Sequence, residues 1–546
     1  MNIWRVPLGV LCGVVLLTQM VQPASAAPVT GDIAEYKQSN GTVVPVRVWG
    51  DEFCRVMESL DGYSVIPDEK KDVICYAKLS GDGRELVSTG TPVRKGQIPT
   101  AQINTLGVEP HIRILPEAAR EKAEAACAQH FAAEKEVLQL AQGYIPPSTS
   151  NAKGITILVD FSDYPATNPG VATPAEIATF LNSTTTSLWG NNGSVRDYYE
   201  DVSNGNLIYT NWVTSYYYRA AQLRLDYSSP DLAHECLQHL EDAGFDFSQY
   251  DSNQDGFVDA VTILTAGPVN GSGLCWPTVW LTNDGVTVNR FIILCALTGP
   301  AGLGLGIVGH ETGHMICGFP NLYNGLFVGG GGAGGYCLMS AFENMNPPHF
   351  CAPLKLKAGW MTVTDFTTPQ DNIAVTAESN ACYRFAHPTN PDEFFLIYNR
   401  QKVNRDAGIF DAGLAIWHVD WAGNNSWAQM TPSQHYMVSL EQADGEFHLE
   451  RFKVSGDENE PKEDMFHAGG YTEFSEFTIP DSDWWDGTPS GLFIHSISDA
   501  STTMTFSFGV TGDLQVSDPR VFSTTGTEGA EPAQTSFAFT LSNTGA

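Results

Sequence analysis

The sequence has few basic residues for its length. Its 546 residues include 29 Lys and Arg against 62 Asp and Glu, which gives a formal net charge of -33. Nucleic acids and anionic membrane surfaces are bound through basic patches, so this composition argues against both as partners. A strong acidic excess fits a soluble secreted protein instead, and some of the carboxylates are candidates to hold calcium.

The sequence also lacks an apolar run long enough to cross a bilayer. A membrane-spanning helix needs about 20 apolar residues, which excludes the alternative of an N-terminal anchor. The stretch VPLGVLCGVVLL is shorter; it follows Arg5 and precedes the small residues Ala24, Ser25 and Ala26. Charge, apolar core and small residues together are typical of an export signal. We predict a signal peptide over 1–26 and a secreted, extracellular protein without membrane insertion.

No two cysteines form a CxxC pair, which argues against a zinc knuckle or a thioredoxin-type site. Ten of the 11 cysteines remain once the signal is removed, in a compartment that permits disulfides. Cys54 with Cys75, or Cys275 with Cys295, could each join neighbouring strands. The sequence alone does not choose among the pairings.

The length of the chain predicts roughly three or four structural units. Residues 27–115 alternate turns with the strand-like runs TVVPVRVWG, DGYSVI, VICYAKL and GDGRELV, which predicts a β-rich prosegment. Residues 116–142 are rich in Ala, Glu and Lys, which predicts a helix. The polar GYIPPSTSNAKG that follows indicates a linker and a processing site, so 116–152 complete the prosegment.

From residue 153 to 361 the pattern predicts a mixed α+β domain. ITILVDFSD, VTILTAG and RFIILCAL have the continuous apolar character of buried strands. Thr173 and Glu176 form a capping-box pattern around Pro174, which predicts the start of a helix.

Residues 362–512 are again β-rich, with DEFFLIYNRQ, GLAIWHVDW and MTFSFGV as the expected strands. Residues 513–546 resemble the opening strands of an immunoglobulin-like sandwich that stops before such a fold closes, and we interpret that stop as a truncation. The overall expectation is therefore an α+β fold with a β-rich region on each side of the central domain.

The most informative motif is HETGHMICGFPNLYN, which begins at His310. Residues four apart share one face of a helix, so His310 and His314 can point at the same metal ion. Glu311 lies beside them, where a carboxylate can act as a general base. This arrangement is typical of zinc proteases. The alternative is a chance match, but the small apolar residues before the motif favour a buried helix.

A zinc site needs a third ligand, and the residues after the helix supply a candidate. Gly318 is expected to end the helix in a left-handed conformation and turn the chain back. Asn321 then becomes the candidate third ligand. Met339, in YCLMS, follows His314 by about two dozen residues, the spacing of a methionine turn beneath a metal site. Its alternative role is an ordinary core methionine.

Together HETGHMICGFPNLY, YCLMS and PPHFCAPLKLKAGW resemble the immune inhibitor A family of secreted bacterial zinc metallopeptidases, which are metzincin-like. KGITILVDFSD, GSVRDYYEDVSNGNL, YDSNQDGFVDAVTILTAG, GLAIWHVD and LEQADG are similar to landmarks of that family in the same order. GDEF and DGYSVI are similar to its propeptide, and the resemblance covers about residues 30 to 510. It implies a secreted zinc endopeptidase, made as a zymogen, that hydrolyses extracellular proteins and peptides.

The sequence departs from the family at the third ligand. In the family a glycine follows the second histidine by three positions, and an aspartate three further on is the expected ligand. Here Cys317 is an extra residue, and Asn321 stands at the aspartate position. A neutral amide is a weaker metal donor than a carboxylate. Either Asn321 or a substitute such as His349 completes a working protease, or the chain is an inactive peptidase-like surface protein that binds glycoprotein or polysaccharide.

For the working enzyme, Glu311 is expected to take a proton from water and return it to the leaving amine. Tyr323 is close enough in sequence to stabilise the oxyanion, and its alternative role is packing behind the helix.

A second metal site is expected in DSNQDGFVD. Asp251, Asn253, Asp255 and Asp259 are spaced to wrap a calcium ion around the turn at Gly256. Thr262 occupies the position where an EF-hand loop has a bidentate glutamate, so the site is partial. The alternative is a polar turn between a helix and a strand.

Two weaker hypotheses concern the cysteines of the prosegment and the WHVD motif. Three cysteines (Cys54, Cys75, Cys127) precede the processing region and seven follow it, so either a disulfide joins the two parts or a prosegment thiol blocks the zinc until cleavage. His418 and Asp420, in WHVD, alternate onto one strand face, where they could serve packing, calcium or substrate.

Overall fold

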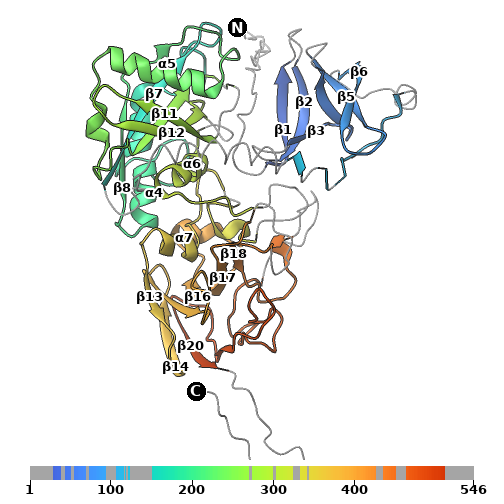
Figure 1. Ribbon diagram of the computed structural model, residues 1–546, viewed down its shortest axis with the longest axis vertical. Coiled ribbons are helices and arrows are strands. Elements are labelled where there is room, and N and C mark those ends of the chain that lie inside the picture. Colours follow the sequence, from blue (N-terminus) through green and yellow to red (C-terminus); the bar gives the residue numbers. More distant parts are fainter. Residues whose placement is uncertain are drawn as a thin grey trace, which may run out of the picture.

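The structure, a computed structural model, describes residues 29–37, 43–50, 55–68, 73–93, 106–115, 117–118, 121–122, 151–267, 269, 274–298, 303–323, 332–340, 343–425, 434–450 and 463–510. The expected signal peptide, most of the helix over 116–142, the linker residues 143–150 and the segment 513–546 lie outside these residues. The linker prediction is wrong for residues 151–154, which begin strand β7 (Asn151–Asp160) because their backbone pairs with a neighbouring strand. The described part has an α+β fold (Figure 1). None of its helices is both long and apolar enough for a membrane span.

The N-terminal strands form one six-stranded antiparallel sheet in sequence order (Figure 1). Its core contains Val44, Val65 and Ile74. GDGR, expected to start a strand, instead forms a turn in which Gly83 has a φ of +72°, because a left-handed residue does not fit a strand. The strands are β1 (Val29–Lys37), β2 (Val43–Gly50), β3 (Arg55–Ser59), β4 (Ser64–Asp68), β5 (Val73–Leu79) and β6 (Leu86–Pro92).

The central sheet has the order β11-β12-β10-β7-β8, with the short β9 also paired to β7. All its pairs are parallel except β11 with β12. Because both faces of a mostly parallel sheet are covered, β10 is buried along its whole length and β7 and β12 are buried over their C-terminal parts, where the sequence predicts apolar strands. The strands of this sheet are β7 (Asn151–Asp160), β8 (Ile208–Val213), β9 (Tyr218–Arg219), β10 (Ala260–Thr265), β11 (Leu274–Leu281) and β12 (Thr287–Cys295).

Alternate residues of these strands pack on two helical layers. Leu158 and Leu264 belong to the core beneath α3, α4 and α6, whereas Ile157 and Ile263 belong to the core beneath α5. The capping box of α3 is confirmed, with the Thr173 side chain accepting from the backbone of its partner. The helices are α3 (Pro174–Asn182), α4 (Val195–Val202), α5 (Ser229–Asp242) and α6 (Leu305–Cys317), with the single turn η1 (Phe247–Tyr250).

Two sheets make up the C-terminal region, and the predicted strands β16, β17 and β20 are confirmed. One sheet has the order β13-β15-β16-β17-β18, the other β14-β20-β19, and a shared core lies between them. The strands are β13 (Thr362–Asp365), β14 (Gln370–Thr376), β15 (Ala381–Ala386), β16 (Glu393–Arg400), β17 (Gly413–Asp420), β18 (Val438–Leu440), β19 (Leu492–His495) and β20 (Thr503–Val510). Short helices η2 (Gly334–Tyr336), α7 (Ala352–Lys357), η3 (Asn404–Gly408) and η4 (His448–Glu450) connect the layers.

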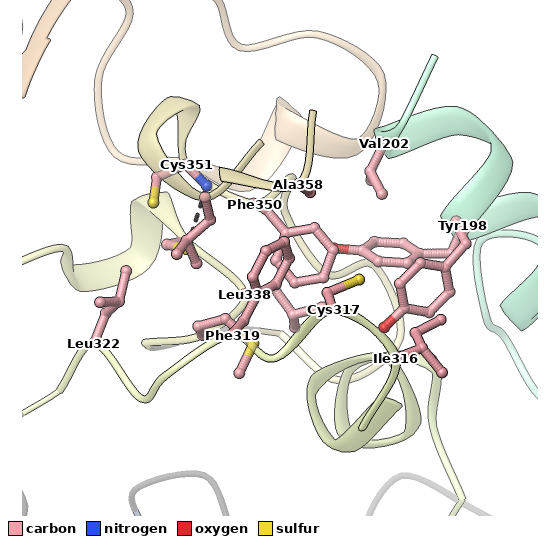
Figure 2. Packing of buried hydrophobic residues seen from close by; sticks show 14 of the residues in the cluster. Tyr198, Val202, Ile316, Cys317, Phe319, Leu322, Leu338, Phe350, Cys351 and Ala358 are labelled. Carbon is pink, nitrogen blue, oxygen red and sulfur yellow. Dashed lines mark hydrogen bonds between the residues drawn. The ribbon is translucent and has the colours of Figure 1, made fainter. Parts of the chain in front are cut away.

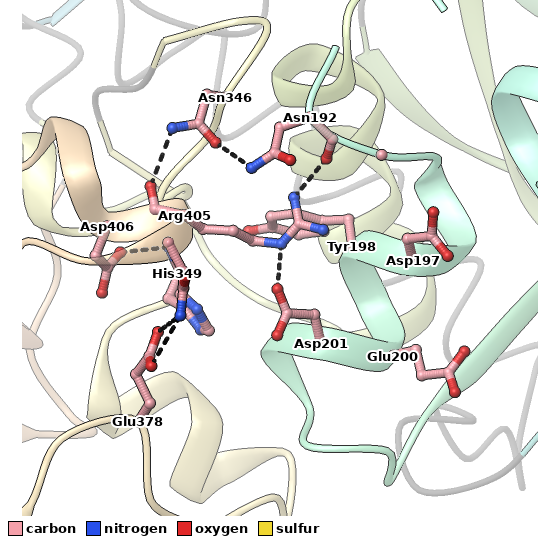
Figure 3. A network of polar contacts seen from close by, with 12 residues as sticks. Asn192, Asp197, Tyr198, Glu200, Asp201, Asn346, His349, Glu378, Arg405 and Asp406 are labelled. Carbon is pink, nitrogen blue, oxygen red and sulfur yellow. Dashed lines mark hydrogen bonds and ion pairs between the residues drawn. The ribbon is translucent and has the colours of Figure 1, made fainter. Parts of the chain in front are cut away.

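A partly buried network of ion pairs and hydrogen bonds joins the C-terminal region to α4 and to the segment after α6 (Figure 3). Arg400 and Asp406 pair through two nitrogen–oxygen contacts of 2.8 Å. Arg400 also donates to the carbonyl oxygen of Tyr336. Arg405 donates to Asp201, on α4, at 2.5 Å and to the carbonyl oxygen of Asn192 at 2.8 Å. Side chains of the β-rich region therefore hold segments on both sides of α6.

Asp464 is completely buried against η2, where its Oδ2 accepts a hydrogen bond from the Tyr336 hydroxyl at 2.6 Å. Its Oδ1 has no hydrogen-bond partner among the described residues. Burial above all, with the nearby charges of Asp444 and Asp411, raises the pKa of Asp464 to about 7. The carboxyl group is thus protonated at mildly acidic pH and costly to ionise.

Asp464→Asn should stabilise the protein at alkaline pH. A carboxyl whose folded pKa is raised contributes its full stability below the unfolded pKa of about 4 and loses it as the pH rises through the folded value. We expect the variant to gain on the order of 3–4 kcal/mol at pH 8, and the gain to shrink toward zero near pH 4. Thermal unfolding across this range measures it. The exposed Asp499→Asn is the control, and an equal effect of both variants would refute the assignment.

Candidate metal centre

Two asparagine side chains define the start of helix α6, and a left-handed glycine defines its end. At its start, the side-chain oxygen of Asn191 accepts from the Leu305 amide at 2.8 Å, and that of Asn344 accepts from the Ile307 amide at 3.0 Å. At its end, Gly318 adopts the left-handed conformation with a φ of 64°, which confirms the predicted stop. The helix therefore has a fixed position along its axis.

Two glycines allow other segments to approach α6 closely. A Cβ atom at Gly313 would lie 3.1 Å from the Met339 sulfur and 3.3 Å from Phe350. A Cβ atom at Gly309 would lie 3.2 Å from Leu338. Figure 2 shows Leu338 and Phe350 packed together beside the end of this helix. The YCLMS segment is thus in direct contact with the helix, and Met339 lies under it as expected from its spacing.

The side chains of His310, His314 and Asn321 converge on one point. The two Nε2 atoms are 3.1 Å apart, and each is 3.1 Å from Asn321 Oδ1. The rings have centroids 4.8 Å apart and are nearly perpendicular. The structure therefore brings together all three residues that the sequence predicts as ligands.

Backbone carbonyls orient both imidazoles, and no sequence motif indicates these contacts. His310 Nδ1 donates to the carbonyl oxygen of Leu338 at 2.9 Å, and His314 Nδ1 donates to that of Phe319 at 2.6 Å. Because a carbonyl only accepts, the proton of each neutral ring is on Nδ1 and the lone pair is on Nε2. Burial lowers the pKa of His310 to about 4, so its ring is neutral near pH 7.

This donor set fits a zinc ion. Two Nε2 lone pairs and an amide oxygen face one another, and a cation relieves the repulsion between them. Donor atoms bound tetrahedrally at about 2.0–2.1 Å lie about 3.3 Å from each other, close to the observed triangle. Among the described residues no group of three or more His, Cys, Asp or Glu side chains could hold a metal. The third donor here is an amide, which is outside that set of residue types.

Glu311 and Tyr323 lie beside these donors. Glu311 is fully buried on α6 next to His310. Tyr323 is 4% exposed, and its ring stacks at 6.4 Å from that of His310. The position of Tyr323 accords with packing beside the ligand, the alternative role considered for it.

His349, the substitute ligand considered above, belongs to a different network. Its Nδ1 contacts the Lys355 ammonium nitrogen at 2.7 Å, and its backbone amide donates to Asp406 at 2.9 Å. Burial, followed by the nearby Lys355 charge, lowers the pKa of His349 well below its usual value. The imidazole is therefore a neutral acceptor for Lys355, which leaves Asn321 as the third donor at the α6 site.

The predicted calcium loop is compact and turns at Gly256, where φ is +88°. Asp251 accepts from the amides of Asp255 at 3.0 Å and Gly256 at 2.9 Å, and Asn253 donates to the Asp255 carboxylate at 3.2 Å. These three side chains converge on one turn.

Asp259 takes a different part in the loop. Its two oxygens accept from the backbone amides of Ser252 and Lys153, so it anchors the loop to β7. The geometry accommodates both the calcium site and the polar turn that the sequence left open.

The WHVD residues form a buried cluster away from α6. His418 lies 3.2 Å from Glu393 and 3.5 Å from Glu441, and His435 lies 2.8 Å from Asp420. Burial opposes a charge on His418, but hydrogen bonds to the two glutamates raise its pKa. These contacts place His418 and Asp420 in a buried hydrogen-bonded cluster on β17.

One suggested disulfide is absent, because Cys295 is a buried free thiol. The described side chains do not include those of Cys54, Cys127 and Cys275, so the prosegment latch lies outside the described residues.

No protein-family model matches the chain, and no curated protein matches its sequence. The resemblance to the immune inhibitor A family therefore rests on the motifs quoted above and on their order.

Changing the third donor should change zinc affinity. Asn321→Asp replaces a neutral amide with a carboxylate, and we expect zinc to bind roughly tenfold or more tightly; Asn321→Ala should weaken it by a similar factor. Competition with a chromogenic chelator measures both. The exposed Asn204→Asp is the matched control. Unchanged affinity in both Asn321 variants would exclude this residue as a ligand.

Calcium should raise thermal stability if the acidic loop binds it. Saturating calcium is expected to increase the melting temperature by a few degrees, because a ligand of the folded state stabilises it. Asp251→Asn should remove the increase, while the exposed Asp226→Asn should keep it. A melting temperature that is the same in calcium and in chelator would leave the loop as a polar turn.

Proposed function

We propose that this protein is a secreted zinc-dependent endopeptidase of the metzincin-like type, made as a zymogen, that hydrolyses peptide bonds of extracellular proteins. The observation that carries the proposal is the meeting of His310, His314 and Asn321 at mutual distances of 3.1 Å, with Glu311 as the neighbouring carboxylate. A chance HExxH would not place a third donor atom, an oxygen from a residue beyond the helix, at the point where the two imidazole nitrogens meet.

Zinc bound by these three donors would supply Lewis acidity to the scissile carbonyl. Glu311 takes a proton from the attacking water and delivers it to the nitrogen of the leaving amine. Its burial beside the ligands keeps the carboxylate close to the reacting atoms. The backbone carbonyls of Leu338 and Phe319 hold the two imidazoles in the tautomer that this chemistry requires.

Secretion and zymogen character are supported by the N-terminal sequence and by the separate six-stranded sheet of β1–β6. The second candidate function, an inactive surface protein that binds glycoprotein or polysaccharide, is favoured by the neutral amide at position 321. Zinc content and proteolysis that depends on Glu311 distinguish the two.

Glu311→Gln should abolish peptide hydrolysis while zinc remains bound. The amide cannot accept the proton, so we expect the rate of casein cleavage to fall by at least about a thousandfold. Elemental analysis and a casein assay measure the two properties on the same sample.

His310→Ala is the companion variant and should lose both zinc and activity. Casein cleavage by Glu311→Gln at the wild-type rate would refute the proposed base. Absence of zinc and of activity in the wild-type protein would favour the binding function.

A further inference from the structure

Two buried cysteines lie next to each other in the two segments that pack against α6. Cys337 is in the YCLMS segment, and Cys351 directly precedes α7. Both are completely buried thiols that are not bonded to each other in this structure, and the Cys351 amide donates to the Cys337 sulfur at 3.2 Å (Figure 2). No sequence motif indicates this pair, since fourteen positions separate the two residues.

The distance from that amide to the sulfur places the two side chains within reach of a covalent bond. An N–Cα bond is about 1.46 Å long, so the Cα atom of Cys351 is at most about 4.7 Å from the Cys337 sulfur. A Cα atom this close to the partner sulfur is compatible with the Cα separations found in disulfides. The geometry is thus that of two thiols ready for a cross-link.

The surroundings also favour reaction at Cys337. Burial opposes ionisation, but the Cys351 thiol, the amides of Cys351 and Met339 and the nearby Arg400 guanidinium together lower the pKa of Cys337. Burial and the neighbouring Cys337 raise the pKa of Cys351. The thiol of Cys337 therefore ionises more readily than that of Cys351, and the more readily ionised thiol is the expected nucleophile in thiol–disulfide exchange.

We propose that Cys337 and Cys351 form a disulfide that joins the two segments packed against α6. In an oxidising compartment a low-molecular-weight disulfide supplies the oxidising equivalents while the chain folds. The Cys337 thiolate attacks one of its sulfurs and releases one thiol, leaving a mixed disulfide. Cys351 then loses its proton and attacks the Cys337 sulfur, which releases the second thiol. The two cysteines lose two electrons and two protons, and the external disulfide is reduced to two thiols.

The cross-link would join the two segments that contact α6 at its glycine positions. Leu338, next to Cys337, accepts the hydrogen bond from His310 Nδ1. Phe350, next to Cys351, and Met339 both contact the position of Gly313. A bond between the cysteines therefore limits movement of the carbonyl that orients His310. This effect on the metal ligand rests on the proposed function; the cross-link itself does not.

Peptide mapping tests the cross-link directly. The full chain is produced in a host compartment that is oxidising, alkylated in denaturant without reductant and digested. We expect one linked pair of peptides, lighter by two hydrogens than the sum of its thiol forms, containing Cys337 and Cys351. Cys236 and Cys382, which are buried thiols in two other places, serve as controls and should be alkylated. Complete alkylation of all four cysteines would overturn the proposal.

Thermal unfolding tests the structural effect. Closing a loop of about fifteen residues should raise the melting temperature by roughly 5–10 °C relative to protein treated with a phosphine reductant. The double variant Cys337→Ala/Cys351→Ala should show no such dependence on the reductant, while Cys236→Ala/Cys382→Ala should retain it. Equal dependence in both double variants would assign the effect to another bond.

Zinc release separates this inference from the proposed function. If the cross-link limits movement of the Leu338 carbonyl, a chelator should remove zinc several-fold faster from reduced than from oxidised protein. Equal release rates would refute the positioning effect. A protein that is cross-linked but binds no zinc in either state would refute the proposed function and leave the disulfide standing.

Discussion

Two backbone carbonyls determine the chemistry of the α6 site. Leu338 and Phe319 accept the Nδ1 protons of His310 and His314, and the Nε2 lone pairs must then face each other and Asn321. Burial disfavours the charged form of His310, so that ring does not relieve this repulsion by taking up a proton. A bound cation would stabilise three converging acceptors, and the donor set fits a metal for this reason.

The position of the Leu338 carbonyl depends in turn on packing and on charge. Gly309 and Gly313 let its segment lie against the helix, and Arg400 donates to the Tyr336 carbonyl two residues earlier. The Arg400–Asp406 pair is buried, where removal of one partner typically costs 3–5 kcal/mol. The β-rich C-terminal region is thereby part of the support for the site, although it contributes none of the three donors.

Much of this arrangement could be predicted from short-range sequence signals. The spacing of His310 and His314 places them on one helical face, and Gly318 marks the end of that helix because glycine tolerates a left-handed conformation. The capping box at Thr173 and the apolar strands were equally readable. The strand predicted over GDGRELV begins only at Leu86, because Gly83 adopts a left-handed conformation that does not fit a strand. The predicted pairing of Cys275 with Cys295 is wrong, because Cys295 is a free thiol.

The sequence by itself determined the helical spacing of the ligands, the apolar strands and the acidic composition, because these depend on local periodicity and on residue type alone. Only the tertiary structure decided that Asn321 rather than His349 meets the two histidines, since Lys355 and Asp406 hold His349 in another network. It likewise decided which carbonyls orient the imidazoles. Backbone acceptors are the same in every residue type, so no sequence pattern can distinguish the ones that fold against a ligand.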